Sequence, residues 1–267
     1  MYGDGLLSRV RDLSIISQKL ILEFRPWDAS SWTWGQRLGW VGFVWGGLEV
    51  VSYLLDKIPP LFKPKQIQMR GKHLDTPGIW DWGFVTFNKF STTFFAYHSV
   101  RYCWYSPHIS WDLRSLNLWN TLGSIIVLYG VYDFFYHCFH RLLHLRSLYW
   151  LIHKHHHNQH APTRGNWDAV NVHPIEFLVG EYLHILALSF VPTHVVTAVV
   201  FVMGGGIIAS LNHTRHDFGF MGIWEVSAHD QHHVKPDCNY SQYTTVWDRI
   251  LATYIPHPDK PDASKSK

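Results

Sequence analysis

The chain has 267 residues and a formal net charge of +3, from 23 Lys and Arg against 20 Asp and Glu. This length allows one sizeable domain or two small ones. The weak positive charge is not gathered into a basic and aromatic stripe, which argues against a nucleic-acid-binding protein. The three cysteines, Cys103, Cys138 and Cys238, lack CxxC spacing, which argues against a disulfide framework and a thiolate metal site.

Three residue types are unusually frequent: 20 His, 14 Trp and 13 Tyr. Tryptophan and tyrosine favour the membrane–water boundary, where an amphipathic ring can lie half in lipid. The mean hydropathy of −0.08 therefore averages two different parts, an apolar membrane part and a polar, His-rich part. The composition indicates a membrane protein with a histidine site.

In chain order, residues 1–36 form an N-terminal segment whose Leu6–Phe24 stretch has apolar residues at helical spacing. Its charges interrupt any signal-peptide core, so an interfacial helix is expected. Residues 37–136 are expected to hold transmembrane helices, and 137–255 to form the His-rich domain, with a membrane hairpin at 175–210. Residues 256–267 are a polar tail. The expected crossings are Leu38–Leu55, Ile79–Trp104, Leu118–Tyr136, Ile175–Val191 and Thr193–Ser210.

The basic residues predict the orientation of these segments. If all five cross, 15 Lys and Arg fall on one side of the membrane and seven on the other. The positive-inside rule places the richer side in the cytoplasm, and every His motif falls on that side. The predicted fold class is an all-α, polytopic membrane protein with four to five transmembrane helices and a cytoplasmic, His-rich helical cap.

The first His motif begins where the third apolar segment ends. His140 and His144 lie four residues apart, which places both on one face of a helix. Asp133 and His137 share this face. Because a ligating imidazole usually donates its second N–H to a carboxylate or carbonyl, we expect Asp133 to orient a ligand imidazole.

The pattern H-x-x-H-H occurs twice further along the chain, each time on one expected helical face. Its first copy holds His153, His156 and His157, and its second holds His229, His232 and His233. His213 and His173 lie near the ends of the apolar hairpin, and His216 follows His213 as a further ligand or supporting residue. The predicted metal ligands are His140, His144, His153, His156, His157, His213, His229, His232 and His233.

These histidines predict two metal ions. Packing does not explain eight converging imidazoles, since a buried polar group without a partner costs about 1–3 kcal/mol. Imidazole suits Fe, Zn, Cu and Ni, and structural zinc closes its shell at four ligands, usually with Cys. Zinc also has no redox chemistry, so a catalytic zinc ion would leave the membrane setting unexplained. The pattern favours two iron ions.

The ordered motifs resemble the fatty acid hydroxylase/sterol desaturase superfamily over about 133–254. They comprise Asp133, Tyr136 and His140-Arg-Leu-Leu-His144, then Ile152-His-Lys-His-His-His157 with Pro162-Thr163, then His229 through Asn239-Tyr240 and Trp247-Asp248-Arg249. His173-Pro174 and the 239–249 stretch are similar to sterol C5-desaturases (lathosterol oxidases). The resemblance implies a di-iron site with His213 as a further ligand, O2 as oxidant, and electrons from cytochrome b5 and its reductase.

The interpretation is therefore a membrane-bound non-haem di-iron oxidoreductase that hydroxylates or desaturates a lipid, with a sterol favoured over a fatty acyl chain. The endoplasmic reticulum is the expected location, with a mitochondrial or plastid membrane as the alternative. Two other functions compete with it. One is a catalytically silent subunit of a larger membrane complex that keeps the metal site. The other is a metal transporter or sensor, which is disfavoured because transport sites lie near the bilayer midplane.

Overall fold

Five long helices make up most of the computed structural model, which describes residues 27–219 and 222–258. They are α2 (Trp34–Lys57), α3 (Ile79–Tyr105), α4 (Ser124–Leu143), α7 (Pro174–Phe190) and α8 (Val195–Asn212). Each lies at a predicted apolar segment, so the all-α fold class is confirmed. The amphipathic helix expected at Leu6–Phe24 lies outside the described residues.

Short elements join and extend these helices. The helical ones are η1 (Ala29–Ser31), η2 (Pro59–Phe62), η3 (Leu113–Ser115), η4 (Trp119–Gly123), α5 (Arg146–Leu148), η5 (Tyr149–His153), η6 (His156–Asn158), α6 (Asn166–Val170), α9 (Val226–Val234) and α10 (Val246–Ile250). Strand β1 (Lys65–Gln66) pairs antiparallel with β4 (His216–Asp217), and β2 (Ile109–Ser110) pairs parallel with β3 (Thr193–His194).

Local sequence accounts for where the long helices begin and end. Thr33 and Gln36 form a reciprocal capping box at the start of α2, which ends just before Pro59 and Pro60. Pro174 is the first residue of α7, where its missing N–H costs nothing, and the His173 side chain accepts a hydrogen bond from the Ile175 N–H. Pro192 separates α7 from α8, as predicted for the hairpin.

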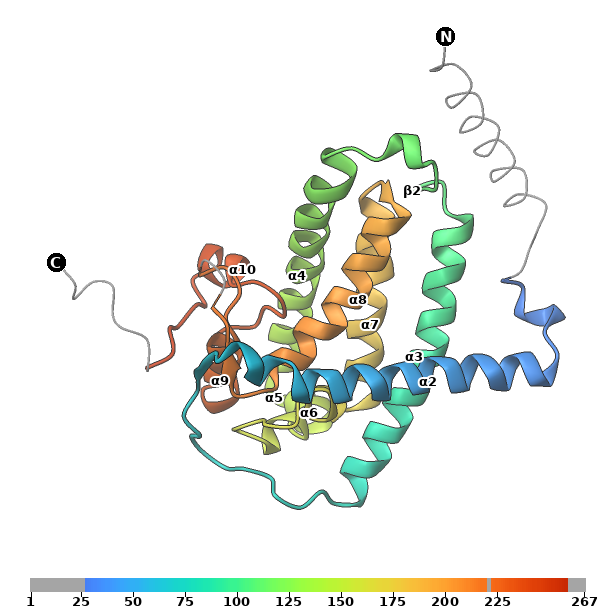
Figure 1. Ribbon diagram of the computed structural model, residues 1–267. Coiled ribbons are helices and arrows are strands. Elements are labelled where there is room, and N and C mark those ends of the chain that lie inside the picture. Colours follow the sequence, from blue (N-terminus) through green and yellow to red (C-terminus); the bar gives the residue numbers. More distant parts are fainter. Residues whose placement is uncertain (1–26, 220–221, 259–267) are drawn as a thin grey trace, which may run out of the picture.

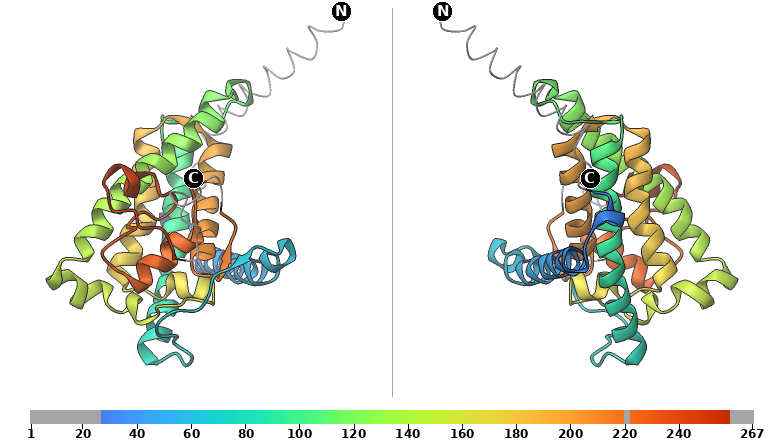
Figure 2. Two further views of the ribbon diagram at one scale, coloured as in Figure 1. Left: turned by 90° about the vertical axis from the view of Figure 1, so that its left-hand side faces the viewer. Right: turned by 90° about the vertical axis from the view of Figure 1, so that its right-hand side faces the viewer.

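Helices α3, α4, α7 and α8 run side by side, whereas α2 lies across them (Figure 1). In the turned views α2 projects from one side of the bundle (Figure 2). The core lies between α4, α7 and α8 and includes Leu128, Tyr132, Leu188 and Phe201. The short helices α5, α6 and α9 gather at one end of the bundle, which is where the His motifs lie.

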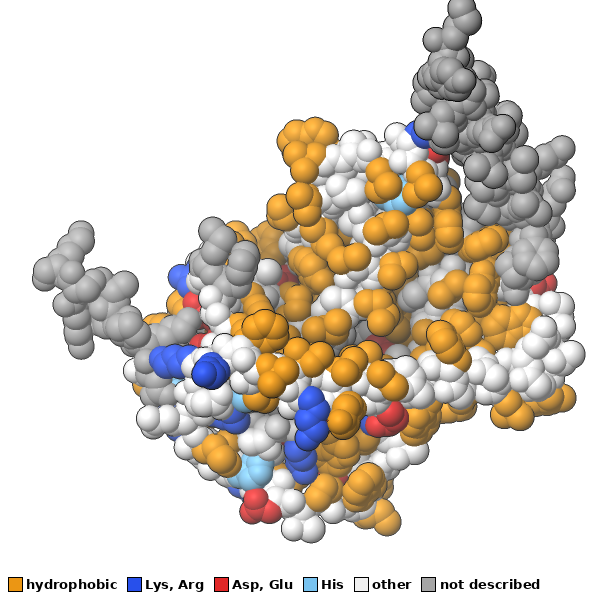
Figure 3. Space-filling view, in the orientation of Figure 1, with side chains coloured by type: hydrophobic (Ala, Val, Ile, Leu, Met, Phe, Trp, Pro, Cys, Tyr) orange, Lys and Arg blue, Asp and Glu red, His pale blue; other side chains and the backbone are white. Residues whose placement is uncertain are grey.

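The outer surface of the bundle is apolar, as a lipid-facing surface requires. Hydrophobic side chains cover the face shown in Figure 3, and the Lys and Arg side chains gather mostly near the end that holds the His motifs. By length and composition, three described helical stretches could cross a membrane: Trp34–Phe62, Trp119–Leu143 and Val195–Asn212. Helix α3 carries the buried polar residues Asp81, Asn88 and Lys89, and α7 has 17 residues. The count of four to five crossings stays a prediction.

A glycine in α8 permits the closest packing inside the bundle. A Cβ atom added at Gly205 would lie 2.6 Å from His184 Nε2 and 2.6 Å from the Tyr243 hydroxyl, two atoms that are themselves hydrogen-bonded at 2.8 Å. We expect Gly205→Ala to lower the free energy of unfolding by about 1–3 kcal/mol. The neighbouring Gly206 has nothing within 4 Å of the same position, so Gly206→Ala is the matched control. Equal thermal stability of the two variants in detergent would contradict this packing.

Candidate metal centre

Four separate stretches of the chain carry the nine predicted ligands to one place. His140 lies in the last turn of α4, and His144 ends that helix. The 153–157 motif occupies η5 and η6, His213 ends α8, and the 229–233 motif lies on α9. All nine imidazoles therefore come from the end of the bundle where the short helices gather.

The nine histidines form two groups, within each of which the candidate ligand atoms lie within 4.8 Å of one another. One group has five members and the other four, and we call them the five-His and four-His groups. The five-His group is His140, His144, His153, His157 and His232; the four-His group is His156, His213, His229 and His233. Each group has as many members as a metal ion has ligands. The structure therefore brings together, in two groups, every residue that the motifs predicted as a ligand.

Each H-x-x-H-H motif contributes to both groups. His153 and His157 belong to the five-His group and His156 to the four-His group. The segment is a π-helical turn followed by a 3-10 turn. The expectation of one continuous helical face at 153–157 is therefore wrong. The 229–233 motif is α-helical, as predicted, yet His232 and His233 point to different groups. Neighbouring residues on a helix are about 100° apart, so a helix lying between two groups supplies both.

Protons cannot account for the contacts inside the five-His group. Nδ1 of His140 lies 2.8 Å from a main-chain carbonyl oxygen, and Nδ1 of His232 lies 2.6 Å from another. A carbonyl only accepts hydrogen bonds, so these Nδ1 atoms carry the proton and the Nε2 atoms carry lone pairs. The Nε2 atoms meet in a row: His140 and His153 at 3.0 Å, His153 and His157 at 3.0 Å, and His157 and His232 at 3.1 Å. Neutral imidazoles offer these three contacts at most two protons, so lone pairs are left facing each other.

The four-His group shows the same deficit. Nδ1 of His213 and Nδ1 of His233 each lie 2.8 Å from a main-chain carbonyl oxygen. Their Nε2 atoms, which carry lone pairs for that reason, lie 3.2 and 3.1 Å from Nε2 of His229. One N–H on His229 cannot donate to both. A cation at the middle of each group would be attracted to every one of these nitrogens, so the donor sets fit two metal ions.

Burial keeps these imidazoles neutral, the form that binds metal. Removal from water, and then the neighbouring imidazoles, hold the pKa of His153, His156, His157, His229, His232 and His233 well below its ordinary value. Additional protons on the imidazoles could otherwise have relieved the lone-pair contacts. The lowered pKa values leave a metal cation as the better partner.

Asp133 does not contact an imidazole of either group. It is fully buried, and its two oxygens accept hydrogen bonds from the main-chain N–H groups of Tyr243 at 2.8 Å and Thr244 at 2.6 Å. The expected direct role in orienting a ligand is therefore wrong, because both carboxylate oxygens accept hydrogen bonds from the main chain of the 240–245 loop. His137 likewise lies beside Asp248, at 3.3 Å, outside both groups.

Asp133→Asn should therefore act on stability. An amide can accept only one of the two main-chain N–H groups and turns its own donor toward the other, which costs about 1–3 kcal/mol in a buried site. We expect a lower melting temperature in detergent with the metal content unchanged. Unchanged stability combined with loss of metal would show that the carboxylate serves the ligands after all.

The histidines flanking these groups have other partners. His216 is half-buried, and its Nδ1 lies 2.7 Å from the Gln66 side-chain nitrogen in the β1–β4 pair. His173 caps α7. Neither belongs to the two groups, so His216 is not placed with the predicted ligands.

Sequence reasoning missed a carboxylate that does contact a predicted ligand. Glu176, near the start of α7, places Oε1 2.9 Å from Nδ1 of His153 and is 5% exposed. The signal was an acidic residue at the head of an apolar segment, directly after His173-Pro174, where an ionised group is costly unless it is paired.

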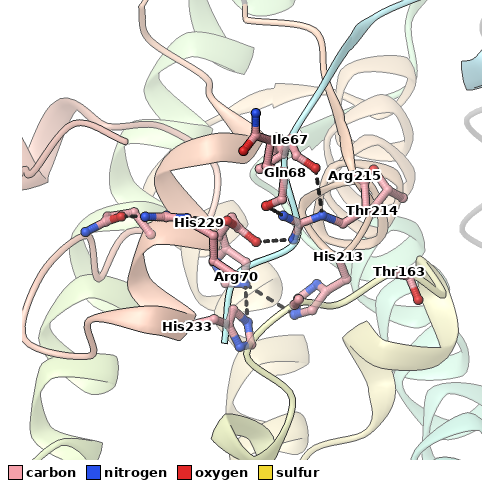
Figure 4. A network of polar contacts seen from close by, with 12 residues as sticks. Ile67, Gln68, Arg70, Thr163, His213, Thr214, Arg215, His229 and His233 are labelled. Carbon is pink, nitrogen blue, oxygen red and sulfur yellow. Dashed lines mark hydrogen bonds and ion pairs between the residues drawn. The ribbon is translucent and has the colours of Figure 1, made fainter. Parts of the chain in front are cut away.

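The sequence also did not predict a network of polar contacts that holds the 63–73 segment over the four-His group (Figure 4). Arg215 donates to the Ile67 carbonyl at 3.3 Å and pairs with the buried carboxylate of Asp230. Asp230 also lies 3.2 Å from His257 Nε2 and 3.8 Å from Arg70. Figure 4 shows the imidazoles of His213 and His233 directed toward His229 beneath this network. The segment therefore covers the candidate metal site from outside.

Known proteins identify the region that holds this site. Residues 125–253, which include all nine histidines, match the family model for fatty acid hydroxylase. This part of the chain is therefore similar to the fatty acid hydroxylase family. Within it lie both His groups, the loop held by Asp133, and the carboxylate of Glu176.

Several relatives of the chain are sterol-modifying enzymes by name. The chain is 26% identical to a cholesterol 25-hydroxylase-like protein of Caenorhabditis elegans, over 60% of this chain and 55% of the relative. It is 33% identical to human lathosterol oxidase, over 51% and 46%, and 27% identical to methylsterol monooxygenase 1 of Rattus norvegicus, over 55% and 52%. The chain thus spans about half the length of these relatives. No solved structure matches it.

Proposed function

We propose that the chain is a membrane-bound oxidoreductase that binds one iron ion in each His group and oxidises a lipid with O2. The observation that carries the proposal is the proton deficit among the facing Nε2 atoms of both groups, which a pair of cations would remove. The nine histidines predicted from the motifs are the proposed ligands. A sterol is the favoured substrate, because the relatives include a lathosterol oxidase and a methylsterol monooxygenase.

Iron fits this donor set and the redox nature of the chemistry better than zinc. Neutral imidazole binds several first-row metals, but zinc cannot change oxidation state. When bound, a pair of iron ions would supply the redox chemistry by which O2 oxidises an unactivated C–H bond, giving either an alcohol or a double bond. The ligands alone do not choose between hydroxylation and desaturation.

The polypeptide's own contribution is to hold and shield the ions. Carbonyl groups fix the tautomers of four ligands, and burial keeps water from competing for them. The aromatic ring of Tyr136, in α4, packs against His140, with ring centroids 5.4 Å apart. The bundle core therefore reaches the five-His group, and we propose that a lipid approaches the site along the apolar helices from the bilayer.

The partners follow from what the chemistry needs. Oxidation of a C–H bond by O2 consumes two external electrons, so an electron donor is proposed, such as cytochrome b5 with its reductase. The endoplasmic reticulum remains the favoured location, with a mitochondrial or plastid membrane as the alternative. The competing hypothesis is a silent subunit of a larger complex that keeps the metal site.

The proposal is tested with full-length protein purified in mild detergent from iron-replete cells. We expect about two iron ions per chain, and oxidation of a sterol when reductase, electron donor and O2 are supplied. A sterol panel and an acyl-lipid panel separate the two substrate classes. Absence of bound metal would overturn the proposed site. Two ions without turnover of any lipid, and without a lipid that accumulates after gene deletion, would support the silent subunit.

The proposed orientation is tested separately. Lys72 is exposed on the segment that covers the four-His group, so a cysteine at this position can be labelled without altering the site. In a Cys138→Ser background, we expect Lys72→Cys to react with a membrane-impermeant maleimide from the cytoplasmic side of intact vesicles. Labelling only after the membrane is permeabilised would reverse the orientation.

A further inference from the structure

The nine imidazoles are not supported in the same way. Nδ1 of four of them lies 2.6–2.8 Å from a main-chain carbonyl oxygen: His140, His213, His232 and His233. His153 instead contacts the Glu176 carboxylate, at 2.9 Å. In residues 27–219 and 222–258, no other member of the two groups has a carboxylate within ion-pair distance. One ligand of the five-His group is therefore distinguished by the charge behind it.

The surroundings of Glu176 direct its charge toward His153. The side chain is buried, and Oε2 has no hydrogen-bond partner among the described residues. Glu176 lies in the first turn of α7, where the positive end of the helix dipole favours a negative charge. Its only described hydrogen bond joins it to His153. A buried carboxylate of this kind stays ionised only beside a positive group, and an imidazole bound to a metal cation would be such a group.

A carboxylate behind an imidazole changes what that imidazole does to a metal. It fixes the tautomer, orients the ring and raises the basicity of the ligand nitrogen. A carbonyl oxygen fixes the tautomer too, but it carries no net charge and raises basicity less. The five-His group thus has more ligand nitrogens than the four-His group, and one of them, on His153, is made more basic by a carboxylate. In the four-His group the described hydrogen-bond acceptors behind the imidazoles are main-chain carbonyl oxygens.

We propose that Glu176 makes the two metal positions unequal, by strengthening the binding of the ion in the five-His group through His153 and favouring its more oxidised state. Glu176 is a positioning residue, since it acts on the metal through an imidazole. The inference rests on the proposed function, because it requires an ion in each group. It goes beyond that function by assigning different properties to the two positions.

Helix α7 supplies a matched control. Glu181 lies five residues further along the same helix, is also buried, and also has an Oε2 without a hydrogen-bond partner among the described residues. It accepts a hydrogen bond from the Thr92 hydroxyl at 2.6 Å and contacts no member of the two His groups. Glu181→Gln therefore removes a buried carboxylate from α7 without altering the support of a proposed ligand.

The test compares iron retention in wild type, Glu176→Gln and Glu181→Gln during titration with an iron chelator, using the full chain in detergent. Glutamine keeps an acceptor for Nδ1 and removes the charge. We expect Glu176→Gln to release one ion per chain at a chelator concentration about 10-fold or more below that needed for wild type, and to hold the second as wild type does. Protein-film voltammetry should show one of two reduction waves moved to higher potential. Glu181→Gln should match wild type in both measurements.

Several outcomes would overturn the inference. Release of both ions together from Glu176→Gln, or equal behaviour of the two Gln variants, would show a structural effect of α7 rather than an inequality of the positions. If Glu176→Gln does not fold, Glu176→Asp is tested instead, because it keeps the charge but moves it away from His153 by one methylene group. Unchanged iron release from that variant would contradict the proposed role of Glu176. Wild-type protein without two ions would refute the proposed function itself, which is a separate result.

Discussion

Replacement of His232 or His156 by alanine is expected to remove metal and abolish turnover. His232 belongs to the five-His group and His156 to the four-His group, and both are buried. Losing a ligand should cost more than the roughly 10–100-fold in metal affinity or activity that follows loss of a supporting residue. We expect the iron content to fall from about two ions per chain to about one or fewer, measured by elemental analysis against protein concentration.

His108→Ala is the control for these variants. His108 is exposed, and it lies just before β2, which pairs with β3 between α7 and α8, and it belongs to neither His group. It should keep both ions and full activity. Full iron occupancy in His232→Ala or His156→Ala would mean that the ligands are assigned wrongly, whatever the activity.

Asp230→Ala is expected to cause a large loss of stability. The carboxylate is 1% exposed and pairs with Arg215, Arg70 and His257. Removing one partner from a buried ion pair leaves an uncompensated charge and costs about 3–5 kcal/mol. Arg215 also donates to the main chain of the segment that covers the four-His group. We therefore expect a lower midpoint of thermal unfolding and faster release of iron from that group.

Asp237 provides the comparison for Asp230. It lies just beyond the same helix, its side chain is 73% exposed, and its contact with Lys235 is 3.9 Å long. An exposed pair of this kind contributes about 0–1 kcal/mol, so Asp237→Ala should leave the unfolding midpoint almost unchanged. If Asp230→Ala were equally mild, the network in Figure 4 would not hold the covering segment in place.

Local sequence was enough to predict the helices and the membership of the site. The five apolar segments became α2, α3, α4, α7 and α8 because apolar length, caps and prolines act within a few residues of the chain. The nine predicted ligands, from His140 to His233, are the nine histidines of the two groups. Repeated spacing on helices predicts that such residues come together, because it places them on shared faces.

The tertiary structure alone decided how these residues are divided and supported. Spacing could not show that His156 joins a different group from His153 and His157, because the division depends on where each motif lies between the two groups. Nor could it show that Asp133 binds a loop 110 residues away while Glu176 supports His153. Both carboxylates lie beside His motifs in the sequence. Which imidazole or N–H each one meets depends on the packing of α4 against α7 and of the 240–245 loop against α4, and this long-range packing is not encoded in the local pattern.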